Sequence, residues 1–145
     1  DSHEIKVFAL DRIVNIDICN KNYFVSDEDI LEYFDDIVGV ANYTEEEVLE
    51  ILFWVSDKDV QYIRTRPIHA SQIFFHSAKE NKLRQLYPQL EGGAFFSINC
   101  KKNYELIQEL TSYGSNLVVL SPQYIVDEVI NYIDNMNEKY SFLRK

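Results

Sequence analysis

The hydrophobic period of the sequence changes twice between residues 95 and 120, and this change limits the fold more than any other feature. Residues 95–100 alternate apolar side chains in steps of two, as a pleated strand does. A helical stripe comes next, and Gly114 follows it at the place where many helices end. The apolar residues of this stripe are Leu106, Ile107 and Leu110. The continuous apolar run at residues 117–120 predicts a second strand, buried on both faces.

A further helix is expected directly after that run. Ser121 offers a hydroxyl that can cap a helix, and Pro122 suits the first helical position. Apolar side chains then recur at helical spacing, at Ile125, Val129, Tyr132, Ile133 and Met136. Residues 95–136 therefore predict the order strand, helix, strand, helix.

The preceding residues predict a similar alternation. Residues 48–55 are rich in strand-forming side chains and hold the only tryptophan, so we expect a strand there and another at residues 73–76. Between them, Ser56 and Asp59 form an aspartate variant of the capping box, which predicts a short helix. Residues 81–93 are polar and contain a Gly-Gly pair, and they are expected to form a loop that is mobile or carries one turn of helix.

From residue 47 onward, the expected order is strand, helix, strand, strand, helix, strand, followed by a final helix. This order predicts the α+β class and a ferredoxin-like βαββαβ sandwich with an additional C-terminal helix. In this fold, two helices cover one face of a four-stranded antiparallel sheet. At 145 residues, the chain is long enough to bury one such core.

The N-terminal part predicts elements that belong to a preceding domain. Residues 6–17 alternate in the manner of a strand, yet no hairpin partner follows them. Ser26 and Asp29 then predict the start of a helix that Gly39 can close. An N-terminal strand and a helix left from another domain are therefore expected before the sandwich.

Charge and composition narrow the class of protein. Twenty-four acidic against fourteen basic residues give a net charge of -10, which opposes general attraction to DNA. No apolar run approaches the ~18 residues of a membrane span, and residues 1–6 carry no signal pattern, so we expect a cytoplasmic protein without a membrane partner. Cys19 and Cys100 lie far apart and form no CxxC pair, which predicts two free thiols.

Several segments together resemble the C-terminal part of bacterial WYL-family transcriptional regulators. They are KVFALDRI at residues 6–13, the loop at Phe24 with the acidic helix after it, RTRPIHASQ at residues 64–72, and TSYGSNLVVLSPQYIVDEV at residues 111–129. The resemblance implies a helix-turn-helix domain, then a WYL domain with a small Sm-like barrel, and then a ferredoxin-like C-terminal extension. The implied divisions are the terminal strand of a truncated WYL barrel at 1–17, a helix and linker at 18–46, and the extension at 47–145. The Trp-Tyr-Leu strand that names the family is absent from this chain.

The same resemblance places Arg12 and Lys6 among the basic barrel residues that contact a nucleotide or single-stranded nucleic-acid effector. Lys6 stands where the family often has arginine. A guanidinium suits phosphate because it can donate two parallel hydrogen bonds. The alternative for Arg12 is an ion pair with Asp11 or with the acidic helix at residues 27–36, and the sequence leaves both open.

A second candidate site is the basic and polar patch within residues 64–72, where an anion could bind despite the net charge. Its members are Arg64, Arg66, His69 and Gln72. The alternative is structural, because cations at the end of a helix stabilise the helix dipole.

No catalytic or metal-binding motif stands out. His69 and His76 match no zinc-ligand spacing with either cysteine, and Cys100 lies on an apolar strand, so neither metal nor cofactor is expected. The sequence predicts the effector-sensing and oligomerisation region of a bacterial transcriptional regulator. This region is expected to be non-catalytic and homodimeric through the edge of residues 7–13, and DNA would be bound only by a helix-turn-helix domain absent from this chain. The alternative is a free-standing, ACT-like module that binds a small metabolite or dimerises.

Overall fold

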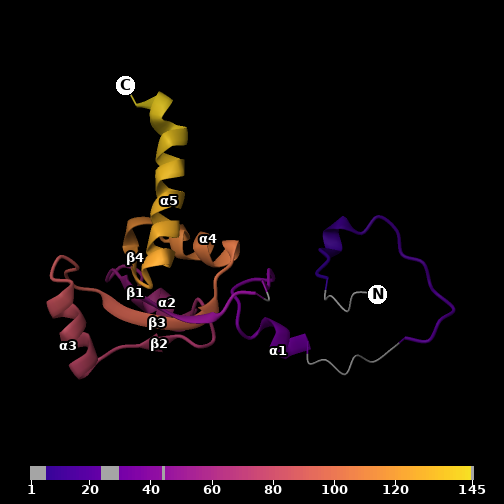
Figure 1. Ribbon diagram of the computed structural model, residues 1–145, viewed down its shortest axis with the longest axis horizontal. Coiled ribbons are helices and arrows are strands. Elements are labelled where there is room, and N and C mark those ends of the chain that lie inside the picture. The colour runs from indigo at the N-terminus through magenta and orange to yellow at the C-terminus, as the bar shows by residue number, and fades with distance from the viewer. Residues whose placement is uncertain (1–5, 24–29, 44, 145) are drawn as a thin grey trace.

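Four strands form the centre of the molecule, and each pairs with its neighbours in antiparallel register. The computed structural model describes residues 6–23, 30–43 and 45–144. The strands are β1 (Val48–Val55), β2 (Ile73–Phe74), β3 (Ala94–Lys101) and β4 (Leu117–Ser121). They lie in the order β2-β3-β1-β4 (Figure 1). This order and the intervening helices confirm the predicted α+β, ferredoxin-like sandwich.

One face of the sheet carries α2 (Val60–Thr65), α4 (Tyr104–Ser112) and α5 (Gln123–Tyr140). The main core lies between this face and the helices because alternate residues of β1 and β3 point toward them. The strands contribute Ile51, Phe53, Val55, Phe96, Ile98 and Cys100, and the helices contribute Ile63, Leu106, Leu110 and Ile125. The predicted helical stripe and both strand patterns are confirmed in these contacts.

The opposite face of the sheet is covered at one end by α3 (Ser77–Leu86), which the sequence analysis assigned in part to a polar loop. Leu83 of α3 packs in a second core with Trp54, Phe75 and Phe95. Residues 81–86 carry more helix than the single turn that was the alternative to a mobile loop, because this segment consists largely of strong helix formers. Only Leu83 in α3 is buried, so no apolar stripe reveals the helix in the sequence.

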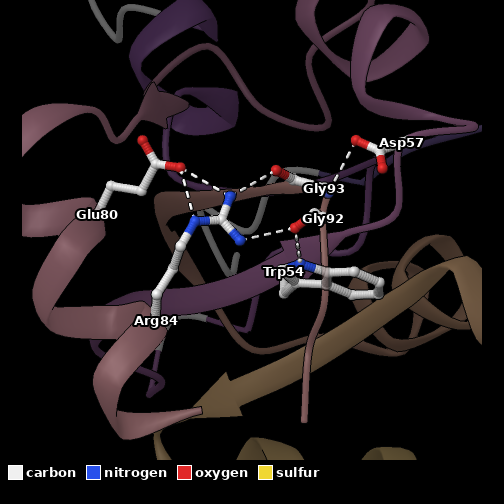
Figure 2. A network of polar contacts seen from close by, with 6 residues as sticks. All are labelled: Trp54, Asp57, Glu80, Arg84, Gly92 and Gly93. Carbon is white, nitrogen blue, oxygen red and sulfur yellow. Dashed lines mark hydrogen bonds and ion pairs between the residues drawn. The ribbon is translucent and has the colours of Figure 1, made fainter. Parts of the chain in front are cut away.

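Arg84 of α3 fixes the turn that leads into β3, as Figure 2 shows. Its guanidinium donates to the carbonyl oxygens of Gly92 and Gly93, each at 2.8 Å, and to the Glu80 carboxylate at 2.7 Å. From the other side, the indole N–H of Trp54 donates to the Gly92 carbonyl at 3.2 Å. The backbone of Gly93 has a φ of 60°, and a Cβ there would collide with β1, so this position requires glycine.

α5 leaves the sheet after its first turns (Figure 1). Its 18 residues correspond to a length of about 27 Å, yet Ile125 is its only fully buried residue. Ile133 and Met136, which the predicted stripe includes, are 52% and 50% exposed. The short 3-10 helix η3 (Ser141–Leu143) extends the free end.

The predicted N-terminal strand is not formed. Residues 10–12 make a 3-10 helix, η1 (Leu10–Arg12), and the other residues of 6–17 have no regular structure. A strand needs a neighbour to satisfy its backbone hydrogen bonds, and the described part of the chain offers this segment none. As predicted, these residues lie outside the sheet (Figure 1).

A short helix, α1 (Ile30–Phe34), follows at the predicted place, while Ser26 and Asp29 fall outside the described residues. α1 ends at Phe34, so Gly39 does not close it. Gly39 instead has a φ of 80° beside the Glu105 carboxylate, where a Cβ would collide.

Residues 36–41 form a strap that is hydrogen-bonded to the junction of β3 and α4. The Lys101 N–H donates to the Asp36 carbonyl at 2.6 Å. The Asn103 side-chain amide donates to the carbonyls of Val38 and Ala41 at 2.9 and 2.8 Å. Glu105 accepts the backbone N–H groups of residues 40 and 41, each at 2.7 Å. The strap is therefore part of the folded unit, although it lies in the segment predicted as helix and linker.

Two local predictions were also wrong. β4 is an edge strand, and residues of its outer face are only half-buried because α3 does not extend that far. The capping box at Ser56 and Asp59 does not form, since the Ser56 hydroxyl has no hydrogen-bond partner among the described residues and the Ser56 N–H donates to the Asn116 carbonyl at 2.8 Å. The carbonyl of Ser56 accepts the N–H groups of Asp59 and Val60 instead, so the turn is held by the backbone.

Candidate ligand-binding surfaces

Arg64 and Arg66 form an exposed pair of guanidinium groups at the end of α2. The guanidinium carbon of Arg64 lies 4.9 Å from the ring centroid of Phe74 on β2, and that of Arg66 lies 5.5 Å from the ring of Tyr62. Both contacts fall within the range of cation–π attraction. Neither arginine is ion-paired with a carboxylate in the part of the chain that the structure describes. Their N–H groups are therefore open to an anionic ligand.

His69 is buried and supports the connection between α2 and β2. Its Nδ1 accepts the Ser71 backbone N–H at 3.2 Å and lies 2.7 Å from the Ser71 hydroxyl. That hydroxyl also accepts the Asn99 N–H at 2.7 Å and lies 3.0 Å from the Asn99 carbonyl. Ser71 thus continues the pairing of β2 with β3 through its side chain, a role that the sequence analysis missed.

Gln72 also bonds to the backbone. Its amide donates to the Ile63 carbonyl at 2.9 Å, and its carbonyl oxygen accepts the Ile68 N–H at 3.1 Å. These bonds close the end of α2 and fix the loop that leads to β2. The candidate patch thus separates into two exposed arginines and two side chains that hold the loop; the predicted ligand contacts of all four remain predictions.

Lys6 and Arg12 are exposed in the N-terminal segment, which lies apart from α2 in Figure 1. Arg12 is the last residue of η1. It lines an open pocket of about 600 Å³ whose lining residues all lie between Val7 and Asp17. It forms no ion pair with a carboxylate of the described residues, Asp11 included. The structure therefore places Arg64 and Arg66 at the same end of α2, each over a different aromatic ring, and places Lys6 and Arg12 in another segment.

The thiol of Cys100 on β3 and the hydroxyl of Ser71 beside it both lie in the folded unit. Burial, and secondarily the charge of Asp36, raise the pKa of the Cys100 thiol to about 12, so it stays protonated at neutral pH. The Ser71 hydroxyl is bonded to the Asn99 backbone as described above. Over residues 6–23, 30–43 and 45–144, no group of three or more His, Cys, Asp or Glu side chains is placed to hold a metal ion.

A groove of about 740 Å³ runs between the projecting half of α5 and the edge of the sheet at β4. Its walls are mostly aliphatic, and among its polar lining residues, Asn137, Tyr140 and Arg144 belong to the last part of α5 and to the residue after η3. This end of α5 projects away from the sheet (Figure 1). The side chains of the apolar walls are Leu110, Leu117, Val118, Val119, Val126, Val129, Ile130, Ile133 and Met136. The sequence predicts the α5 stripe but not the groove, because a stripe does not show which of its residues the sheet will cover.

The comparison with protein families identifies the folded unit that carries these surfaces. The family model of the WCX domain matches residues 47–136, which span the whole sheet and most of α5. The chain belongs to the WCX domain family. This domain is the C-terminal domain associated with WYL regulators, so the predicted resemblance is confirmed for the extension. That residues 1–17 derive from a WYL barrel remains a prediction.

Two further findings complete the comparison. A search of curated proteins finds no match to this WCX chain. Among the helices of the described segments, none combines the length and the apolar composition that crossing a bilayer requires.

Proposed function

We propose that this WCX chain is the effector-sensing and assembly region of a bacterial transcriptional regulator. Membership of a regulator-associated domain family supports this proposal over a free-standing, ACT-like module. In the complete regulator, a helix-turn-helix domain would bind DNA in the cytoplasm. The chain, with a net charge of -10 over its 145 residues, would not add general affinity for the double helix.

Effector binding is supported by the guanidinium groups of Arg64 and Arg66, which form no ion pair with any carboxylate of the described residues. Each lies over an aromatic ring, which orients it while leaving N–H groups for phosphate oxygens. Tyr62, which Arg66 contacts, is 46% exposed and offers part of a ring face for stacking of a base. A nucleotide or a short single-stranded nucleic acid matches this chemistry. Lys6 and Arg12 would supply separate phosphate contacts on the N-terminal segment, which only a single strand long enough to reach both places would make together with Arg64 and Arg66.

A non-catalytic role is consistent with the states of the nucleophilic side chains. The Cys100 thiol is fully buried and its pKa is raised to about 12, so thiolate chemistry at neutral pH is disfavoured. The Ser71 hydroxyl serves the pairing of the β2 end with Asn99.

Assembly is proposed as a homodimer. Residues 7–13 form no strand, so the edge first considered for pairing does not support it. The support comes from η3, which extends the free end of α5 and in which Phe142 and Leu143 are 80% and 61% exposed. Sedimentation over a range of concentrations measures the association, and a variant with Phe142→Ser and Leu143→Ser should dissociate it. An unchanged dimer in that variant would remove the α5 end from the interface.

Titration with a fluorescently labelled single-stranded oligonucleotide tests the effector site. The variant with Arg64→Ala and Arg66→Ala should bind at least tenfold more weakly, because each charge-assisted hydrogen bond contributes about 1.5–3 kcal/mol. Arg12→Ala should weaken binding separately. Lys82→Ala, which removes an exposed cation of α3, is the matched control and should bind as the unmodified chain does. Equal affinity of all four proteins at low salt would refute the proposed site.

A further inference from the structure

We infer that the groove between α5 and β4 is a binding site for a small aliphatic monocarboxylate. This site lies apart from the arginine pair on α2, so it stands or falls independently of the nucleotide site. The inference rests on three properties of the groove, which are its apolar walls, its charge and its length.

The walls favour a hydrocarbon occupant. The groove of about 740 Å³ lies within the ~300–1,000 Å³ range of small-molecule sites, which are mostly apolar with a few polar groups. Ile133 and Met136 on α5 are about half exposed in it, while Leu110 and Leu117 close its inner end. Water against these side chains is unfavourable, so an aliphatic tail should gain roughly fourfold in affinity for each CH₂ group that it buries.

The charge of the lining favours an anion at the outer end. No aspartate or glutamate lines the groove, although the chain has 24 acidic residues. Arg144 lies at the outer end, and its guanidinium donates a hydrogen bond to the side-chain oxygen of Asn137. Arg144 has no carboxylate partner within the described segments, so its remaining N–H groups can bind a carboxylate in two-pronged geometry.

The length sets the size of the tail. The α5 side of the groove runs from Val126 to Asn137, which corresponds to about 17 Å along the helix axis. A molecule with its carboxylate at Arg144 and its tail toward the sheet would fill this span with on the order of ten carbons. The class of ligand is therefore a medium-chain aliphatic acid.

Calorimetric titration of the complete chain with hexanoate, octanoate, 1-octanol and octylammonium tests this inference. Octanoate should bind once per chain and roughly fifteenfold more tightly than hexanoate, because it adds two CH₂ groups. It should exceed 1-octanol and octylammonium by about tenfold or more through the charged contact with Arg144. Arg144→Gln should remove that preference while leaving the binding of 1-octanol unchanged.

Ile133→Glu places a carboxylate inside the groove and should abolish octanoate binding. Leu86→Glu, at an exposed apolar position of α3, adds the same charge elsewhere and is its matched control. Circular dichroism checks that both variants are folded. If Ile133→Glu does not fold, the octanoate preference of Arg144→Gln serves as the test instead. The inference is overturned if octanoate does not bind, if octylammonium binds equally well, or if Ile133→Glu leaves binding intact. The inference is also overturned if a second copy of the chain fills the groove. Sedimentation would then show a dimer that the Ile133→Glu substitution dissociates but that added octanoate does not.

Discussion

Replacing Asn103 by alanine should lower the free energy of unfolding by about 2–4 kcal/mol. Asn103 is 2% exposed, and its side-chain oxygen caps α4 by accepting the Leu106 N–H at 2.7 Å. Loss of such a cap costs about 1 kcal/mol. The carbonyls of Val38 and Ala41 also lose their donors, and each half-buried carbonyl should contribute about 0.5–1.5 kcal/mol to the loss.

Asn103→Ser separates these contributions. A serine hydroxyl can still accept the Leu106 N–H, but it cannot reach the strap with two donors. Urea unfolding should therefore rank the unmodified chain first, Asn103→Ser second and Asn103→Ala last. Asn135→Ala, at an exposed position of α5, is the control and should change stability by no more than about 0.5 kcal/mol.

Hydrogen exchange supplies a local readout for the same variants. The amides of Val40 and Ala41 are bonded to Glu105, and they should exchange faster once Asn103 no longer holds the strap. A stability loss below about 1 kcal/mol for Asn103→Ala, with unchanged exchange at the strap, would refute the reasoning.

Three other outcomes are expected. Arg84→Ala should lower the free energy of unfolding by about 1–3 kcal/mol, because two carbonyls of the turn before β3 and the Glu80 carboxylate lose their partner; urea unfolding followed by Trp54 fluorescence measures it. Gly93→Ala should cost about 2 kcal/mol or more in the same assay, since its φ is 60° and the new Cβ would collide with β1. Stability should fall as pH rises from 9 toward 12, because the unfolded chain loses the Cys100 proton first, near the ordinary pKa of 9.0, while the folded pKa is about 12. Cys100→Ala should flatten this decline in alkaline unfolding curves, although it lowers stability at neutral pH.

The elements with two or more periodic apolar contacts were predictable from the sequence. Strand β3 and helix α4 were assigned correctly because alternating or helically spaced residues such as Phe96, Ile98 and Leu106 are the ones that the core buries. α3 was missed because a single buried residue, Leu83, gives no period. Its helix depends on intrinsic propensity and on one contact, which a pattern search does not register.

In the N-terminal segment, the sequence pattern predicts a strand that does not form. Residues 6–17 have the alternation of a strand, but alternation specifies which side chains share a face, and a strand forms only where another backbone completes its hydrogen bonds. The candidate patch at residues 64–72 was limited in a similar way. The closeness of these four residues in the sequence does not show which side chains are exposed. Arg64 and Arg66 are exposed, whereas His69 and Gln72 form hydrogen bonds with the backbone.

The strap at residues 36–41 determines how motion of the preceding segment would reach the WCX domain. It is bonded at Lys101 and Asn103, directly at the end of β3, and β3 is a central strand that pairs on both sides with β1 and β2. At Lys101, β3 is paired with β1, and this ladder runs the whole length of both strands, whereas β2 pairs with β3 only at residues 96–97. A pull on the strap therefore acts on the centre of the sheet and not on an edge strand. The domain should turn as a rigid body, and the bending point should lie before Asp36.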